Sequence, residues 1–363
     1  MRIFSATESI SPAIARTKLM LFKPFRFGRS WKLAATGYLG GVTTYFLPFP
    51  VIYLCFIPFA RSQGAPSYVI PLIIVGVATL MLFYLAIFYL CSRLRFAFFD
   101  IVLNRGVFVA PAWRKYSSQS RKWALFKIAL GTAYFALLAI PFVPLIKGLI
   151  ATFSSIHFVR DQQPPPAFTQ AIFSVYAALL FFYLAIGIFA LLSSLMSDFV
   201  VPSLALEDTT LAEALSRAGR LLRNEPGAVC LYALIKIAIF LVGGIVVAIL
   251  FYIFLLAVVL VGFLIGFLGY FLLHLLHVPQ AVMTALAIIF GAFLYLFTIF
   301  YGTFLASGAL YTITESYALY FLGGRYPLLG DILDRTTPPS DPIPPAPVSG
   351  YVPIAPIPPA STP

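Results

Sequence analysis

Charge is the scarcest property of this chain. Only 10% of its 363 residues are charged, and only twelve are Asp or Glu, whereas a soluble globular domain carries about 25% charged residues. So few acids, mostly isolated in loops, leave little material for acid–base catalysis. The chain also has only three cysteines and three histidines, without the spacing typical of a metal site. We therefore predict no catalytic residue, no metal and no cofactor.

Hydrophobic residues instead make up 61% of the chain. Residues 33–60 and 62–92 carry no charge, and residues 237–314 form a charge-free run of 78. A helix needs about 20 apolar residues to cross about 30 Å of hydrocarbon. These runs predict an all-α polytopic membrane protein, a transmembrane bundle with six spans. The predicted spans are about 33–60, 68–100, 124–152, 168–202, 228–254 and 280–318.

A basic motif recurs at intervals near 100 residues. Arg16, Arg114 and Arg217 are 98 and 103 residues apart, and each lies in a basic stretch that precedes two long apolar segments. The next apolar segment opens with a lysine in each case: Lys32, Lys127 and Lys236. This period predicts three helical hairpins, each preceded by an amphipathic elbow helix lying on the membrane surface.

The longest apolar run does not fit this repeat directly. It could hold three spans, yet the repeat allows two, so residues 255–279 become an apolar insertion at the tip of the third hairpin. We expect this insertion to be re-entrant or interfacial, with Gly262, Gly266 and Gly269 allowing close packing. The alternative is a seventh span, which would put the C-terminus outside.

The remaining boundaries follow from composition. Residues 1–32 form a basic and aromatic N-terminal segment with an interfacial helix, and residues 33–322 form the transmembrane domain. Residues 323–363 are rich in proline and cannot bury enough apolar surface to fold, so we predict a disordered tail.

Lysine and arginine are distributed unevenly between the loops. Seven precede the first span and eight lie in residues 93–127, whereas the loop after the first span has Arg61. The positive-inside rule then places the N-terminus and residues 93–127 in the cytoplasm, and six spans bring the C-terminus there as well. Since the basic residues lie in short loops between apolar runs, the formal net charge of +12 does not indicate nucleic acid.

Basic side chains at this predicted cytoplasmic surface are candidates for contact with anionic lipid headgroups. The alternative is that they only orient and anchor the protein. The candidates are Lys23, Arg26, Arg29, Lys32, Arg114, Lys115, Arg217, Arg220 and Arg223.

Four further charged residues lie close to or within the predicted spans, where charge is costly and often functional. They are Arg95, Asp198, Lys236 and Glu315. All four are expected at a similar depth near the cytoplasmic side, so a salt-bridge cluster between the repeats is one prediction. The other is that each side chain reaches the membrane surface separately.

Several ordered features resemble a known group of proteins. These are the element Leu21-Phe22-Lys23-Pro24-Phe25, the passages around Arg114 and Arg217, and the closing segment of residues 316–322, Ser-Tyr-Ala-Leu-Tyr-Phe-Leu. Together, over residues 9–330, they resemble uncharacterised bacterial polytopic membrane proteins related to the membrane domain fused to some glycerophosphodiester phosphodiesterases. The resemblance implies a six-span membrane domain without the catalytic barrel, and no catalytic residue is carried over.

From these observations we expect a non-enzymatic scaffold or accessory subunit of a membrane complex. It would be a multi-pass protein of the bacterial cytoplasmic (inner) membrane, in contact with anionic lipids and a protein partner. A carrier or channel for a lipid or small amphiphile is the alternative, and a membrane-embedded enzyme is the third. A carrier should have a polar-lined cavity between the hairpins, whereas an accessory subunit should have a packed apolar interior.

Overall fold

The computed structural model of the protein describes residues 4–22, 27–42, 45–55, 66–106, 108–155, 166–207 and 209–336, with positions 57, 61 and 64. All regular structure in these residues is helical, as the sequence predicted. The elements are α1 (Ile10–Phe22), α2 (Phe27–Val42), η1 (Phe49–Cys55), α4 (Val69–Asn104), α5 (Val109–Lys115), α6 (Ser117–Ser155), α7 (Pro166–Leu206), α8 (Leu211–Asn224), α9 (Pro226–Leu275), α10 (Gln280–Phe297), η2 (Thr298–Gly302), α11 (Thr303–Gly323) and α12 (Pro327–Thr336).

Five helical segments of the described residues are long and apolar enough to cross a membrane, as in a multi-pass membrane protein. They are Val69–Asn104, Ser117–Phe142, Ile172–Leu206, Pro226–Leu275 and Gln280–Gly323. The predicted first span over 33–60 is not confirmed as a sixth, because α2 ends at Val42 and the short 3₁₀ helix η1 follows. Pro48 and Pro50 lack the backbone N–H that a continuing α-helix needs.

The third hairpin differs from the prediction. Helix α9 continues without a break for 50 residues, from Pro226 to Leu275, a length of about 75 Å at 1.5 Å per residue. The re-entrant or interfacial segment predicted at 255–279 is therefore wrong: residues 255–275 extend α9, and only the turn before Gln280 forms the tip. No proline lies between Pro226 and that turn, and no Asp, Glu, Lys or Arg follows Lys236 in α9, so nothing of this kind ends the helix earlier. His277, with φ of 55°, and Pro279 redirect the chain.

Short helices lie at the three predicted elbow positions: α1 before α2, α5 before the long α6, and α8 before the long α9. The N-terminus of α8 is fixed by a capping box, in which Thr210 and Glu213 each bond the other's backbone N–H. Helix α1 is packed into the protein, with Ala13 and Arg16 buried. Whether any of the three lies on a membrane surface stays a prediction.

The C-terminal tail begins later than predicted. Residues 327–336 form helix α12, and its Leu329 and Leu333 are fully buried. The prediction of disorder from residue 323 is therefore wrong up to residue 336, because this segment carries apolar residues four apart that reach the core. Residues 337–363 lie outside the described residues.

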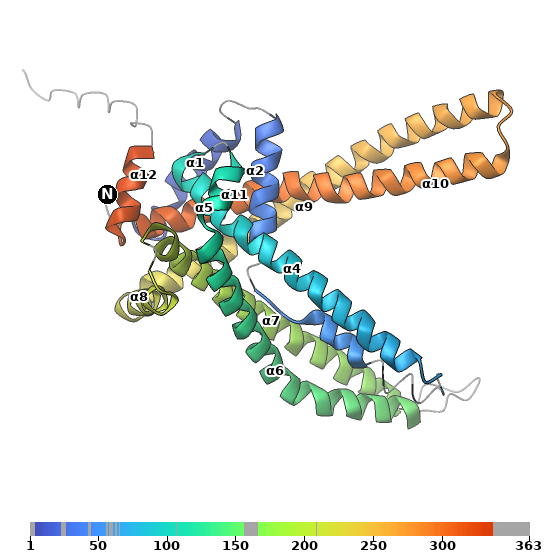
Figure 1. Ribbon diagram of the computed structural model, residues 1–363, viewed down its shortest axis with the longest axis horizontal. Coiled ribbons are helices and arrows are strands. Elements are labelled where there is room, and N and C mark those ends of the chain that lie inside the picture. Colours follow the sequence, from blue (N-terminus) through green and yellow to red (C-terminus); the bar gives the residue numbers. More distant parts are fainter. Residues whose placement is uncertain are drawn as a thin grey trace, which may run out of the picture.

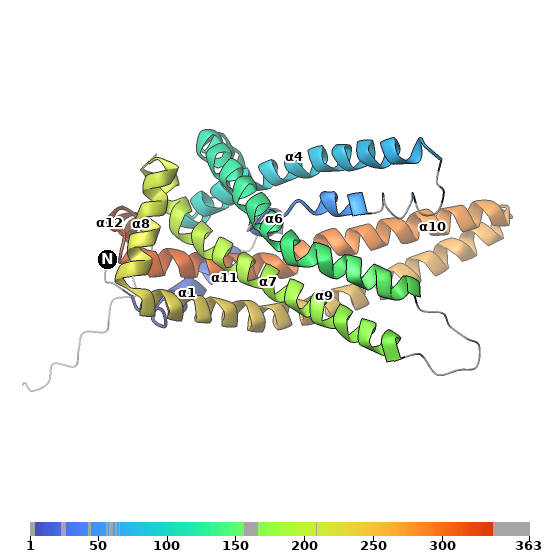
Figure 2. The ribbon, with the colours of Figure 1, turned by 90° about the horizontal axis from the view of Figure 1, so that it is seen from below.

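The buried core lies at one end of the molecule, and two arms extend from it (Figures 1 and 2). Helices α1, α8, α11 and α12 gather at that end, which we call the base. Helices α4, α6 and α7 form one arm, and α9 with α10 forms the other. The main hydrophobic cluster belongs to the base and includes Phe98, Val200, Tyr232 and Phe321. The arms instead expose apolar side chains, which is typical of surfaces that face lipid.

Helix α2 crosses α11 at very short range. A Cβ added at Gly308 of α11 would lie 2.1 Å from the Cβ of Ala34 of α2. The contact is possible only because residue 308 has no side chain, which is a common device for close helix packing in membranes. After α2, Phe46 stacks on Tyr84 of α4 at 5.4 Å between ring centroids, which keeps the first hairpin together.

Candidate functional site

Asp198 of α7 is the centre of a buried charge network at the base. Its Oδ1 accepts a hydrogen bond from Arg95 of α4 at 3.2 Å, and its Oδ2 accepts one from the Tyr232 hydroxyl of α9 at 2.7 Å. Lys236, one helical turn after Tyr232, forms an ion pair with the same Oδ2. Three donors from two other helices therefore surround one carboxylate, and its side chain is only 4% exposed.

Arg95 extends the network to a fourth helix. One of its terminal nitrogens bonds Asp198, and the other forms an ion pair with Glu315 of α11. The order is thus Lys236–Asp198–Arg95–Glu315, two cations alternating with two anions. The structure brings together all four residues of the predicted salt-bridge cluster, which come from all three hairpins. Because each charge has an opposite neighbour, burial does not leave any of them uncompensated.

Two adjacent serines of α7 accept hydrogen bonds from two lysines. Ser194 lies one turn before Asp198, and its hydroxyl accepts a second hydrogen bond from Lys236 at 2.7 Å. Lys127 of α6 donates to the backbone oxygen of Ser193 at 2.7 Å and is 1% exposed. Lys127 from α6, in the same hairpin as α7, and Lys236 from α9, in the third hairpin, therefore approach adjacent serines of α7.

Lys127 and Tyr232 lie at the network in the structure but are not among the four residues predicted from the sequence. Lys127 could have been found, because it occupies the same position in the repeat as Lys236. Lys32, the third lysine of the set, is exposed on α2 instead. Tyr232 carried no such signal: its role depends on the stacking of its ring against Tyr317 at 4.9 Å and Phe321 at 4.5 Å, which directs its hydroxyl towards Asp198.

Chemically, this network is suited to holding helices together. Taking an ion out of water costs several kcal/mol, which good pairing offsets but rarely exceeds. Such a group contributes little net stability, yet it penalises any arrangement that separates its members. We conclude that the network fixes how the three hairpins meet at the base.

The predicted lipid-contact residues do not form one site. Lys32, Arg114, Lys115, Arg220 and Arg223 are exposed, and they belong to three separate elements: α2, α5 and α8. Arg217 forms an ion pair with Glu207, and Lys115 forms one with Asp100 at 3.3 Å. Lys23, Arg26 and the side chain of Arg29 lie outside the described part of the chain.

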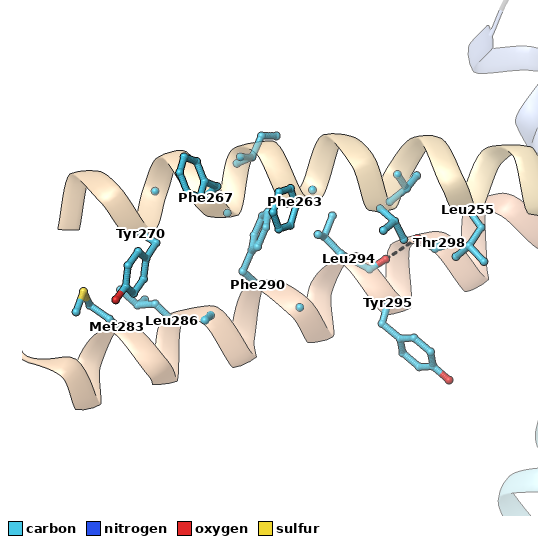
Figure 3. Close-up of a pocket in the computed structure, with 18 of the residues that line it drawn as sticks. Leu255, Phe263, Phe267, Tyr270, Met283, Leu286, Phe290, Leu294, Tyr295 and Thr298 are labelled. Atoms are coloured by element: carbon cyan, nitrogen blue, oxygen red, sulfur yellow. Dashed lines mark hydrogen bonds between the residues drawn. The ribbon is translucent and has the colours of Figure 1, made fainter. Parts of the chain in front are cut away.

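An apolar cavity of about 990 Å³ lies in the other arm, between α9 and α10 with η2 (Figure 3). Phenylalanine, leucine and glycine dominate its lining. The hydroxyl of Thr298, which also lines the cavity, donates a hydrogen bond to the backbone oxygen of Leu294 at 2.8 Å. A smaller cavity of about 300 Å³ lies between α6 and α7 beside Phe142 and Phe181. Among the described residues, no group of three His, Cys, Asp or Glu side chains could hold a metal ion.

A family model described as "Family of unknown function (DUF7544)" covers residues 4–332. The chain belongs to this family. The match to the DUF7544 family includes α1, α8 and α11 of the base and the first part of α12, and the family description names no activity. It also shows no link to the glycerophosphodiester phosphodiesterases. No curated protein and no solved structure matches the chain.

Proposed function

We propose that this DUF7544 protein is a non-enzymatic scaffold or accessory subunit of a membrane complex. The observation that carries the proposal is the network Lys236–Asp198–Arg95–Glu315, in which each buried charge is paired inside the protein. A network of this kind rigidly positions three hairpins. It leaves the outer halves of those hairpins as the surfaces for other molecules.

Those outer halves are suited to a partner within the bilayer. Leu82 of α4 is 70% exposed and Leu260 of α9 is 69% exposed, and each belongs to a different arm. The arms diverge from the base in Figure 1. A protein with a rigid base and two separated apolar arms can hold a second membrane protein beside either arm, because helix packing in lipid rests on shape and close contact.

The proposal includes a location. The protein would lie in the bacterial cytoplasmic membrane with both termini in the cytoplasm, which the excess of lysine and arginine in residues 1–32 and 93–127 supports. The exposed cations of α2, α5 and α8 would then face anionic headgroups, each such charge contributing about 1 kcal/mol.

A second candidate function is a carrier or channel for a lipid or small amphiphile. The size of the cavity between α9 and α10, about 990 Å³, favours it, although the lining is not the polar one expected of a carrier. The accessory role is preferred because the two cavities described above have apolar linings, whereas the polar side chains of the base are used in the charge network.

Site-specific photocrosslinking in living cells tests the proposal. A photoreactive amino acid is placed at Leu82 or Leu260, with the buried Leu329 as the control position. A scaffold should give a discrete protein adduct from at least one arm and none from position 329, and the same partner should co-purify from native membranes. Lipid adducts alone from both arms, with a protein that purifies by itself, would contradict the scaffold and favour the carrier.

A further inference from the structure

The cavity between α9 and α10 is a groove that runs along the second arm. Its lining on α9 recurs every three or four residues from Phe251 to Leu273, and α10 with η2 presents a facing stripe. Figure 3 shows Phe263, Leu286, Phe290 and Leu294 between the two helices. The groove is therefore built from one face of each helix.

The two helices touch at one level and separate towards the tip. At Gly262, an added Cβ would lie 2.4 Å from Leu294 Cδ1, so the backbone here is as close as the facing side chain allows. At Gly266 the nearest atom, on Phe290, would be 3.6 Å away, and at Gly269 and Gly291 nothing lies within 4 Å. The expectation that all three α9 glycines permit close packing holds at Gly262. At Gly269 the missing side chain leaves open space.

The part of the groove between Gly262 and the tip is open, and its size limits which molecules can bind there. From Gly262 to Leu273 it extends about 16 Å at 1.5 Å per residue, which is about half of the roughly 30 Å hydrocarbon thickness and so the depth of one leaflet. A partner helix is about 10 Å wide and cannot enter between two helices that meet at Gly262. Water would find few hydrogen-bond partners among these side chains. A single hydrocarbon chain is narrower than a helix and apolar, so it matches both the lining and the length of this part of the groove.

The tip provides a place for a polar headgroup. His274, His277 and Gln280 are exposed at the turn, directly beyond the open end of the groove. Tyr270, which lines the groove, has its ring beside His274 at 6.3 Å between centroids. The change from apolar lining to polar turn is what a lipid, with its tail inside and its head outside, would meet.

We propose that the groove between α9 and α10 binds one acyl chain of a phospholipid, with the headgroup at the turn before Gln280. The bound chain fills the space at Gly269 and Gly291 and joins the two helices of the arm. This inference does not depend on the scaffold function, because it concerns a lipid held by one arm and not a protein partner.

Photoreactive lipid provides the test. The full chain is reconstituted in vesicles that contain a phospholipid with a diazirine in one acyl chain, illuminated, digested and mapped by mass spectrometry. Adducts should concentrate on groove residues such as Phe263 and Phe290, above the level at Leu256 and Leu260. These two leucines do not line the groove, and their exposure, 70% and 69%, is close to the 73% of Phe263. Equal labelling of groove and outward residues would overturn the proposal.

Filling the groove gives a matched comparison. The double variant Gly269→Leu and Gly291→Leu adds two side chains where nothing lies within 4 Å. Gly244→Leu adds the same side chain to α9 at another open position, outside the groove. The groove adducts should be lost in the double variant and retained in Gly244→Leu, with unchanged helical content in both. Persistence of the adducts in the double variant would refute the site. Labelling by a diazirine free fatty acid, but not by the phospholipid, would refute the phospholipid assignment.

Discussion

Arg325 donates a hydrogen bond to Glu225 at 2.9 Å, although 100 residues separate them in the sequence. Glu225 directly precedes α9, and Arg325 follows α11, so this ion pair joins the two ends of the third hairpin. Arg325 also donates to the backbone oxygen of Phe4 at 3.1 Å. The start of the chain, the start of α9 and the end of α11 therefore lie together on one side of the molecule.

This arrangement predicts the topology of the third hairpin. Single cysteines placed at Ser216 in α8 and Asp331 in α12, in a chain without its native cysteines, should react with an impermeant reagent from the same side. A cysteine at Gln280 should react from the opposite side, because the tip is one long helix away. Labelling in sealed cells and in inverted vesicles gives the sides. Accessibility of residues 216 and 331 from opposite sides would contradict the hairpin.

Removing the central carboxylate of the network should destabilise the base strongly. Asp198→Asn leaves the buried Lys236 without an anion and Arg95 with Glu315 alone, and breaking a buried pair in this way costs about 3–5 kcal/mol. Lys236→Met should cost less, since Asp198 keeps Arg95 and Tyr232 as donors. Denaturation of the purified protein in detergent measures both. The exposed Asp331→Asn is the control and should stay within about 0.5 kcal/mol of the wild type. An equal loss in Asp198→Asn and Asp331→Asn would show that the network is not a structural element.

The crossing of α2 and α11 should not tolerate even one methyl group. Gly308→Ala places a Cβ 2.1 Å from the Ala34 Cβ and 2.3 Å from its Cα, and such overpacking costs about 1–3 kcal/mol. In Gly244→Ala nothing lies within 4 Å of the new Cβ, so the better helix propensity of alanine should stabilise by up to about 1 kcal/mol. The two thermal midpoints should therefore shift in opposite directions, and a shift of the same sign would contradict the close contact.

The segment between α11 and α12 should respond to acid. Tyr326 donates to Glu207 at 2.6 Å. This hydrogen bond, with the help of Arg217, lowers the pKa of the Glu207 carboxyl below its ordinary value. A lowered folded-state pKa means that the stabilisation is present above the unfolded value of about 4.3 and is lost as the pH falls through the folded pKa. The thermal midpoint of the wild type should exceed that of Glu207→Gln at pH 7, and the difference should close in acid. A difference that is constant with pH would exclude an ionic role for Glu207.

Much of the fold could be predicted because lipid imposes simple rules. Charge-free runs of sufficient length predicted helices at α4, α6 and α7, since a bilayer requires each backbone group to bond within its own helix. The same rule gave no sign of the turn before Gln280, and at residues 33–60 a span is not confirmed, because α2 ends at Val42 and the short 3₁₀ helix η1 follows. Composition indicates which residues can lie in lipid. It does not indicate where a helix ends within an unbroken apolar run.

The candidate site could also be predicted only in part. Arg95, Asp198, Lys236 and Glu315 could be grouped from the sequence, because charges at similar depth in separate hairpins are costly unless they pair. Which residue is central could not be derived, since that depends on the rotation of four helices about their axes. Tyr232 and Lys127 entered the network only through those rotations.

The sequence by itself determined that the described residues are helical, with several helices long and apolar enough to cross a membrane, and it determined the near-100-residue period. Both follow from residue composition and spacing, which act locally along the chain. Tertiary structure decided that Asp198 receives three donors, that α9 extends to Leu275, that α12 packs into the base and that an open groove remains near Gly269. Each of these depends on contacts between residues far apart in the chain, whose distances are set by the packing of whole helices.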